Sequence, residues 1–538
     1  MRGLGFYFLF ALALIWIVHF PCTATERQEF SIQQALLNGH AAHEGFVKCR
    51  DFVKGWLAHA DPETGLIPRN LNQSSDIWNA HDCGADNYSF MVLTAALTDR
   101  ELYEGRMLTM LESERRLTSR LGSLPDVYSF AKNDFEHPEI DLDRLMFGAS
   151  EYIKDGLLPL TEWLGFSPWR ERLLDMLDDM WRYASVQTLY GPIVSENVEI
   201  NGEMLQVLSR VFWMTGEKKY LDWAVRLGDY YLLNDHHPTR DFTRLRLRDH
   251  GCEIISGLCE LYATVHFALP EKKKEYQPHL YEMLERIAQV GRNKHGLFYN
   301  VINPQNGEII DTGIADTFGY TFNGFYTVFL LDDAVQLRND VLFGLSNLNH
   351  YQSFDWERGS ADGYADAIEG ALNLYNRERL DDLADWIDSE IAIMWKKQQP
   401  SGIIEGWHGD GNFARTTLMY CLWKTRGLTI QPWRDDVIWG AAQNGDQLQI
   451  ILVAKEPWRG TLHFDSARHK TLLNLPFDWP RINQFPEWFT IEKKYNYLFE
   501  GLEQIELQNG ATLLEQGLAI QLKANEMLAF SVQQIGLR

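Results

Sequence analysis

Residues 247–265, LRDHGCEIISGLCELYATV, show the pattern that decides the fold. A short loop of charged and polar residues runs straight into a helix that is too apolar for a protein surface. Such helices pack side by side, so their polar N-terminal loops gather at one end of the bundle. The pattern recurs at 79–97, 196–213, 311–330, 359–375 and 408–423, and more weakly at 137–160. We therefore expect one polar cavity, surrounded by Asp86, Asp249, Asp316, Asp362 and Asp366.

Amphipathic stretches such as 167–184 and 218–233 separate these segments and predict outer helices. Apolar inner helices that alternate with amphipathic outer ones at intervals of about 45–65 residues favour a closed (α/α) toroid. An open solenoid is the alternative, but it would expose the aromatic side chains of the inner helices. Seven inner helices fit six hairpins with an extra terminal helix, the (α/α)6 ring, or seven hairpins, the (α/α)7 ring.

Three regions are expected along the chain. Residues 1–24 predict a secretory signal peptide, because an apolar run follows Arg2 and small residues precede a cleavage site after Ala24. An uncleaved signal anchor is the alternative. Residues 25–430 form the predicted toroid. Residues 431–538 alternate with period two between Gly turns and predict an antiparallel β-sandwich, which we expect to be structural because it lacks clustered acids.

Composition restricts the partners. The formal net charge of −24 argues against nucleic acid and anionic membranes, since both bind basic surfaces. Cysteine is too sparse for a disulfide scaffold, and we expect Cys252 and Cys259 to be buried packing residues. No His-x-x-x-His, Cys-x-x-Cys or phosphate-binding Gly-rich loop occurs, so the sequence predicts neither a metal nor another cofactor. Nothing in the sequence indicates an oligomeric state.

An (α/α) toroid followed by a β-sandwich, behind a secretion signal, resembles the six-hairpin glycosidase-like superfamily. The resemblance covers nearly the whole mature chain and rests on architecture and on the repeated loops. This superfamily includes glycoside hydrolases and polysaccharide lyases, some of which act on uronic-acid sugars. The resemblance therefore implies a secreted carbohydrate-active enzyme with an oligo- or polysaccharide substrate. It assigns no residue a role.

The polar loops supply the candidate catalytic groups. Glycoside hydrolysis needs two carboxyl groups, one on each side of the scissile bond. Asp249, His250 and Glu253 are the richest group, and the spacing of Asp249 and Glu253 predicts one shared helical face. For Asp249, helix capping is the alternative. Further catalytic candidates are Asp316, Asp362 and Asp366. The predicted substrate-binding residues are Trp78, His81, Asp86, Asn87, Arg248, Tyr320, Asn323, Tyr364, Trp407, Asp410 and Asn412.

The same loops permit a polysaccharide lyase. A lyase needs a Tyr or His base beside a uronate carboxylate that a cation neutralises. His250, Tyr320 and Tyr364 are candidate bases, and Arg248 is a candidate for the cation, although it is also placed to offset nearby acids. We predict a hydrolase ahead of a lyase. A sugar epimerase and a glycan-binding protein without activity are the less favoured alternatives.

Overall fold

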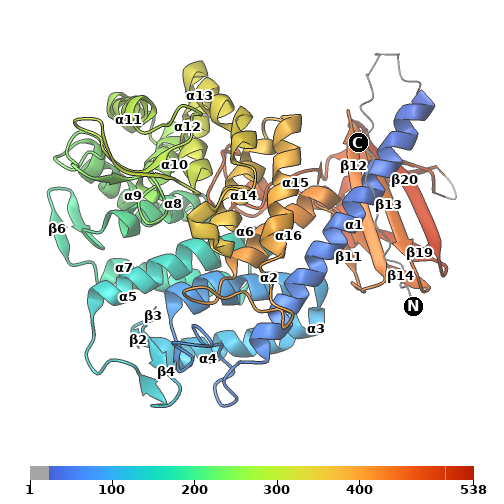
Figure 1. Ribbon diagram of the computed structural model, residues 1–538, viewed down its shortest axis with the longest axis horizontal. Coiled ribbons are helices and arrows are strands. Elements are labelled where there is room, and N and C mark those ends of the chain that lie inside the picture. Colours follow the sequence, from blue (N-terminus) through green and yellow to red (C-terminus); the bar gives the residue numbers. More distant parts are fainter. Residues whose placement is uncertain (1–23, 503–504, 538) are drawn as a thin grey trace, which may run out of the picture.

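The computed structural model describes residues 24–502 and 505–537 of the chain (Figure 1). The protein is mainly helical, with a strand-rich C-terminal region that starts at β11 (Thr429–Gln431), as the sequence predicts. The predicted leader lies outside the described residues apart from Ala24, where α1 (Ala24–Leu57) begins. Within the described residues, no helix is both long and apolar enough to span a bilayer.

One set of helices is buried along almost its whole length, as the apolar segments predict. In α10 every residue from Glu253 to Val265 is buried. Neighbours along the chain pack against each other, from α8 through α10, α12 and α14 to α16, and α16 also contacts α1 and α2. These inner helices are α2 (Ser89–Thr98), α5 (Leu142–Glu151), α6 (Leu158–Leu164), α8 (Val198–Thr215), α10 (Glu253–Ala268), α12 (Phe318–Asp332), α14 (Ala361–Tyr375) and α16 (Asn412–Thr425).

Glycines allow the inner helices to approach closely. A Cβ atom on Gly319 of α12 would lie 2.3 Å from the Cα of Gly370 in α14. A Cβ atom on Gly257 of α10 would lie 2.4 Å from the carbonyl oxygen of Gly202 in α8. Both distances are shorter than real Cβ contacts, so any larger residue would force these helices apart.

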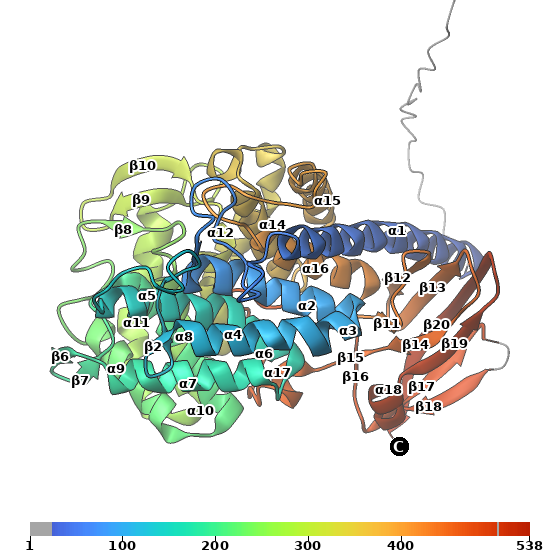
Figure 2. The same cartoon turned by 90° about the horizontal axis from the view of Figure 1, so that it is seen from below.

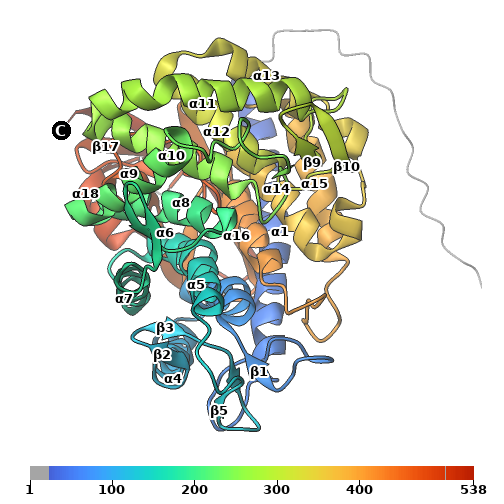
Figure 3. The ribbon, with the colours of Figure 1, turned by 90° about the vertical axis from the view of Figure 1, so that its left-hand side faces the viewer.

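The amphipathic segments form outer helices, each of which covers inner ones. α9 packs against α8, α11 against α10, α13 against α12, and α15 against α14. Figure 3 shows α11 and α13 on the outside of α10 and α12. The outer helices are α3 (Arg100–Leu102), α4 (Leu108–Thr118), α7 (Pro168–Arg182), α9 (Lys218–Leu232), α11 (Pro270–Val290), α13 (Val335–Ser346) and α15 (Asp381–Trp395).

Two of the inner helices contain π-helical segments, which the sequence pattern did not predict. η1 (Ala80–Tyr88) leads into α2, and η3 (Tyr152–Leu157) joins α5 to α6. They pack against each other, and a Cβ atom on Gly156 of η3 would lie 3.0 Å from the Cα of Ala85 in η1. Insertions of this kind re-aim side chains and are frequent at functional sites. The remaining short helices are η2 (Tyr103–Met107), η4 (Leu348–Tyr351) and η5 (Trp356–Gly359).

The strand-rich region contains two antiparallel sheets. The larger has the order β12-β13-β20-β17-β18, and the smaller has the order β11-β14-β19. α1 runs from the helices onto the larger sheet (Figure 2), where Asn38 Nδ2 donates to the Ala441 carbonyl oxygen at 2.8 Å. The elements are β12 (Val437–Asn444), β13 (Gln447–Ala454), β14 (Trp458–His463), β15 (Asp465–Ser466), α17 (Arg468–Thr471), β16 (Thr490–Ile491), β17 (Tyr495–Glu500), β18 (Glu506–Asn509), α18 (Gly510–Gln516), β19 (Leu518–Leu522) and β20 (Glu526–Leu537).

One hydrophobic core runs through both regions. Phe46 of α1 stacks on Trp439 of β12 with ring centroids 5.1 Å apart. Cys252 and Cys259 are buried and free, as expected. Short strands also edge the helical region, namely β1 (Ile77–Trp78), β2 (Ser119–Leu121), β3 (Leu124–Pro125), β4 (Tyr128–Ser129), β5 (Asp134–Phe135), β6 (Val186–Thr188), β7 (Gly191–Ile193), β8 (Leu245–Arg246), β9 (Tyr299–Asn303) and β10 (Glu308–Ile314).

Candidate active site

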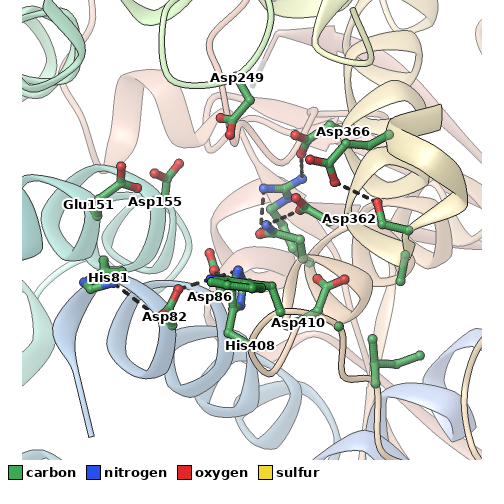
Figure 4. A pocket seen from close by; sticks show the side chains of 18 of the residues that line it. His81, Asp82, Asp86, Glu151, Asp155, Asp249, Asp362, Asp366, His408 and Asp410 are labelled. Atoms are coloured by element: carbon green, nitrogen blue, oxygen red, sulfur yellow. Dashed lines mark hydrogen bonds and ion pairs between the residues drawn. The ribbon is translucent and has the colours of Figure 1, made fainter. Parts of the chain in front are cut away.

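The polar loops before the inner helices converge on one cavity of about 740 Å³. Figure 4 shows Glu151 and Asp155 on one side of it, Asp362 and Asp366 on the other, and Asp249 between the two sides. The predicted site residues that line the cavity are His81, Asp86, Arg248, Asp249, His250, Tyr320, Asp362, Asp366, Trp407, Asp410 and Asn412.

Six predicted site residues do not line this cavity. Trp78, Asn87, Asn323 and Tyr364 are buried among the helices, so the structure does not place these predicted substrate-binding residues at the cavity. The predicted catalytic residues Asp316 and Glu253 are also buried, at 4% and 2% exposure, and lie outside the cavity lining. The sequence pattern marks the end of a helix, but it does not reveal which way each side chain turns there.

The loop before α10 differs from its predicted form. α10 begins at Glu253, and His250 has a left-handed backbone with φ of 63°. Asp249 therefore precedes the helix and shares no helical face with Glu253. The capping alternative for Asp249 is also wrong, because the N-cap position belongs to Cys252.

Asp249 and His250 form an ion pair at the cavity. His250 Nε2 lies 3.0 Å from Asp249 Oδ2, and its Nδ1 bonds Glu199. The Asp249 carboxylate raises the pKa of His250 to about 10, so the imidazole is protonated at neutral pH. Burial opposes ionisation of Asp249, but the charges of His250, Lys154, Arg246 and Arg248 together outweigh it and lower the pKa of Asp249. The Asp249 side chain is 34% exposed, so it is an ionised carboxylate that faces the cavity.

A second acidic group lies at the junction of α5 and η3. Glu151 hydrogen-bonds Asp155, and carboxylate oxygens of Glu151, Asp155 and Glu203 lie within 4.8 Å of one another. One buried cation, Lys154, accompanies these three carboxyl groups, with its Nζ 2.8 Å from Asp155 Oδ1. Burial and mutual repulsion raise the pKa of Glu151 well above its usual value, and burial raises that of Glu203. The group therefore retains at least one proton at neutral pH.

A third group belongs to η1. Asp82 accepts hydrogen bonds from Arg69 and, at 2.6 Å, from Asn79 Nδ2. Burial opposes ionisation of Asp82, but His408 and these donors lower its pKa to about 2. Burial raises the pKa of the neighbouring Asp86 well above its usual value. η1 thus presents to the same cavity two carboxyl groups whose pKa values are shifted in opposite directions.

The opposite side is built by α14 and α16. Asp362 accepts from Asn412 Nδ2 at 2.8 Å, and burial together with Asp366 raises its pKa well above the usual value. Asp366 is held by Arg415 Nη2 at 2.7 Å and by the Tyr320 hydroxyl at 2.8 Å. Both donors bind Oδ1 of Asp366, which is 5% exposed and lines the cavity, so they fix the orientation of this carboxyl group.

Within the part of the chain that the structure describes, three groups of side chains have the spacing of metal ligands. They are Asp82, Asp86 and His408; Glu151, Glu199 and His250; and Glu151, Asp155 and Glu203. In each group a positive charge is already present or adjacent, from Arg69, His250 or Lys154. The donor sets fit a cation such as Ca²⁺ in oxygen content, but these built-in positive charges and shared protons already offset the acids.

Sequence reasoning placed Asp82 in the first polar loop without selecting it as a site residue, and it singled out neither Glu151 nor Asp155. Asp82 and Asp86 are four residues apart within η1, and Glu151, the last residue of α5, is four residues before Asp155 of η3. The sequence did contain a usable signal for these residues, namely two acids four positions apart with a Gly close by. Gly84 and Gly156 are these glycines, and they allow η1 and η3 to pack in contact.

Glu253 yields a prediction about stability. Burial raises its pKa to about 7 from an ordinary value of 4.5. A raised carboxyl pKa contributes stability that is fully present below pH 4.5 and is lost as the pH rises through 7. Glu253→Gln should therefore gain on the order of 1–3 kcal/mol over the natural protein between pH 5 and pH 8. Urea unfolding of the natural protein and of Glu253→Gln at both pH values measures this gain. An identical pH dependence of the free energy of unfolding in the two proteins would contradict the prediction.

No protein-family model and no curated protein matches the chain. Solved structures do resemble it. A possible member of the GH105 family from Salmonella enterica shares 14% identity, with 52% of this chain and 81% of that chain covered and a TM-score of 0.40. A family 76 glycoside hydrolase from Bacteroides thetaiotaomicron shares 12%, with coverage of 52% and 68% and a TM-score of 0.39. Unsaturated glucuronyl hydrolase from Bacillus sp. GL1 shares 11%, with coverage of 53% and 86% and a TM-score of 0.37.

The second and third are described as hydrolases of sugars, and the first as a possible member of a glycoside hydrolase family. At these identities and TM-scores they do not decide the reaction, which has to be inferred from the site itself.

Proposed function

We propose that this protein is a secreted glycoside hydrolase in which the contacting carboxyl groups of Glu151 and Asp155 donate the proton to the leaving oxygen. The observation that carries the proposal is that Glu151, whose pKa is raised well above its usual value by burial and by neighbouring carboxyl groups, contacts Asp155 and shares the cavity with the ionised Asp249. General acid catalysis requires a group that is still protonated at the working pH. Secretion rests on the predicted leader alone.

Asp249 supplies the second carboxylate of the mechanism. It is ionised, and a third of its side chain is exposed, so a water molecule or a sugar carbon can reach it. In this role it activates water or stabilises the positive charge that develops on the sugar ring. Asp82 is ionised too, but its side chain is 7% exposed and its Oδ2 is already bonded to Arg69 and Asn79.

The candidate bases of a lyase suit that reaction poorly. A lyase base must be neutral or anionic before it takes up a proton. His250 is protonated beside Asp249, which raises its pKa to about 10. Burial raises the pKa of Tyr320 well above its usual value, and its hydroxyl is bonded to Asp366 and Glu369. Tyr364 is buried away from the cavity. These observations favour hydrolysis over elimination.

Uronic-acid-containing glycans are the proposed substrates. Arg358 lines the cavity, is exposed and makes no ion pair within the described residues. Arg248 binds Glu357 through Nη2 at 3.0 Å and leaves its Nε without a partner. These two guanidinium groups are placed to bind a sugar carboxylate. The exposed Trp407, at 73%, offers a ring face for a neighbouring sugar.

The proposed scaffold is a closed (α/α) toroid with residues 431–538 as a β-sandwich. Contacts of α16 with α2 support closure, and α8, α10, α12, α14 and α16 each follow an outer helix, as the hairpins of a toroid require. The two antiparallel sheets support the sandwich.

The function is tested by incubating the mature protein with matched neutral and uronic polysaccharides. Reducing ends and ultraviolet-absorbing unsaturated ends are measured in the same samples. New reducing ends without unsaturated ends, on a uronic glycan, are expected. Unsaturated ends would establish a lyase, and no products from any glycan would overturn the enzymatic proposal.

A further inference from the structure

The strand-rich region sends a buried loop into the helical region. Between β15 and β16, residues 479–486 (WPRINQFP) are all buried, yet they form neither helix nor strand. Loops normally run over the surface, because buried backbone N–H and C=O groups need partners. A loop buried over eight consecutive residues therefore has to be bound by the helices around it.

The inner helices supply those partners. Arg210 of α8 donates from Nη2 to the Ile482 carbonyl oxygen at 3.1 Å. Asn373 of α14 donates from Nδ2 to the Arg481 carbonyl oxygen at 2.9 Å. Glu369 of α14 accepts from the Asn483 backbone N–H at 2.6 Å. The loop is thus fixed between α8 and α14.

The tip of this loop reaches the candidate active site. Ile482 packs with Tyr320, whose side chain lines the cavity. Asn483 Nδ2 donates to Asp155 Oδ1 at 2.5 Å. Lys154 Nζ contacts the same oxygen at 2.8 Å, so this oxygen of Asp155 is held from two directions. Asp155 also hydrogen-bonds Glu151 and lines the cavity.

We propose that Asn483, although it belongs to the strand-rich region, is a positioning residue that fixes the Asp155 carboxyl group for proton donation. This inference rests on the proposed function. It means that residues 25–430 alone do not make a competent site, because a side chain from beyond them orients the proton donor. The strand-rich region was expected to be structural only, so the inference goes beyond that expectation.

The backbone at Asn483 suggests a clean variant. Its φ is 60°, in the left-handed region, where Gly carries no steric cost. Asn483→Gly therefore removes the side-chain donor and keeps the backbone. Asn474 is the matched control, because it lies on the same connection with φ of 54° and is exposed. Asn474→Gly reports the cost of a flexible glycine without loss of the Asp155 contact.

Kinetics on the uronic glycan test the inference. Asn483→Gly should lower kcat by about 10- to 100-fold with KM nearly unchanged, as expected for a misplaced catalytic group. Because a donor to a carboxylate favours its charged form, the basic limb of the pH–kcat profile should move to higher pH. Asn474→Gly should retain the kcat and the pH–kcat profile of the natural protein. Equal effects of the two variants, or a profile of Asn483→Gly that matches the natural protein, would overturn the inference.

Two further measurements test the inference if Asn483→Gly does not fold or if the natural protein shows no activity. If Asn483→Gly does not fold, Asn483→Asp tests the contact at constant shape. Its carboxylate faces Asp155, so it should move the basic limb further in the same direction, and an unmoved limb would overturn the inference. If the natural protein hydrolyses no glycan, the proposed function fails. Crystal structures of both Gly variants then show whether the Asp155 carboxylate rotates only in Asn483→Gly, and an unmoved carboxylate would contradict the positioning role.

Discussion

Replacing Asp155 by Asn or Glu151 by Gln should each lower kcat by about 10²- to 10⁴-fold, the usual loss when a positioned proton donor is removed. Both side chains line the cavity, at 14% and 13% exposure, and they hydrogen-bond each other. Steady-state kinetics of both variants measures these losses.

Glu203→Gln is the matched control for this prediction. Glu203 belongs to the same acidic group and is 1% exposed, but it does not line the cavity. Its replacement should cost less than about tenfold in kcat if proton donation is confined to groups that touch substrate. Equal losses in all three variants would indicate a structural acidic cluster and no proton donor. Asp249→Asn and Asp82→Asn then locate the ionised partner, and a larger loss in Asp82→Asn would reassign that role from Asp249.

Replacing Arg210 by Met should destabilise the protein by about 3–5 kcal/mol, since it leaves buried carboxylates without their cation. Arg210 is 1% exposed and binds Glu162 at 3.1 Å and Glu260 at 2.6 Å. It also donates to the Ile482 carbonyl oxygen, so its loss releases the buried loop 479–486. The midpoint of urea unfolding measures the change.

Arg182→Met is the comparison for this stability test. Arg182 pairs with Asp179 at 2.5 Å, but its side chain is 65% exposed. Exposed ion pairs contribute about 0–1 kcal/mol, so the midpoint should shift little. If Arg210→Met shifts it no more than Arg182→Met does, the buried network does not hold the two regions together.

The sequence predicted the general plan of the site because hydrophobic periodicity is a local property. A helix that is apolar on all sides has to be buried, so the segments at 253–265 and 361–375 were correctly placed inside. The polar loops before these helices then had to meet, and Asp249 and Asp362 do line the same cavity. The change to period two near residue 431 likewise predicted the strand-rich region.

The proposed proton donor was not predictable in the same way. Glu151 and Asp155 lie where α5 passes into η3, in the segment whose pattern was weakest. A π-helical turn shifts the phase of the side chains, and a period of 3.6 residues does not reveal it. The contact of Asn483 with Asp155 joins positions 328 residues apart, which only tertiary structure brings together. Asp249 lies before the helix that was predicted to contain it, because the backbone at His250 adopts a left-handed conformation.

The most direct test of the central claim is hydrolysis of the uronic glycan in water enriched in oxygen-18, with mass spectrometry of the products. A glycoside hydrolase transfers a water oxygen to the anomeric carbon, so each new reducing end should carry one heavy oxygen. The account predicts this label in the natural protein and its loss, together with turnover, in Asp155→Asn. Products that lack the label and carry an unsaturated sugar would contradict it, because they would show that the chain is cut by elimination.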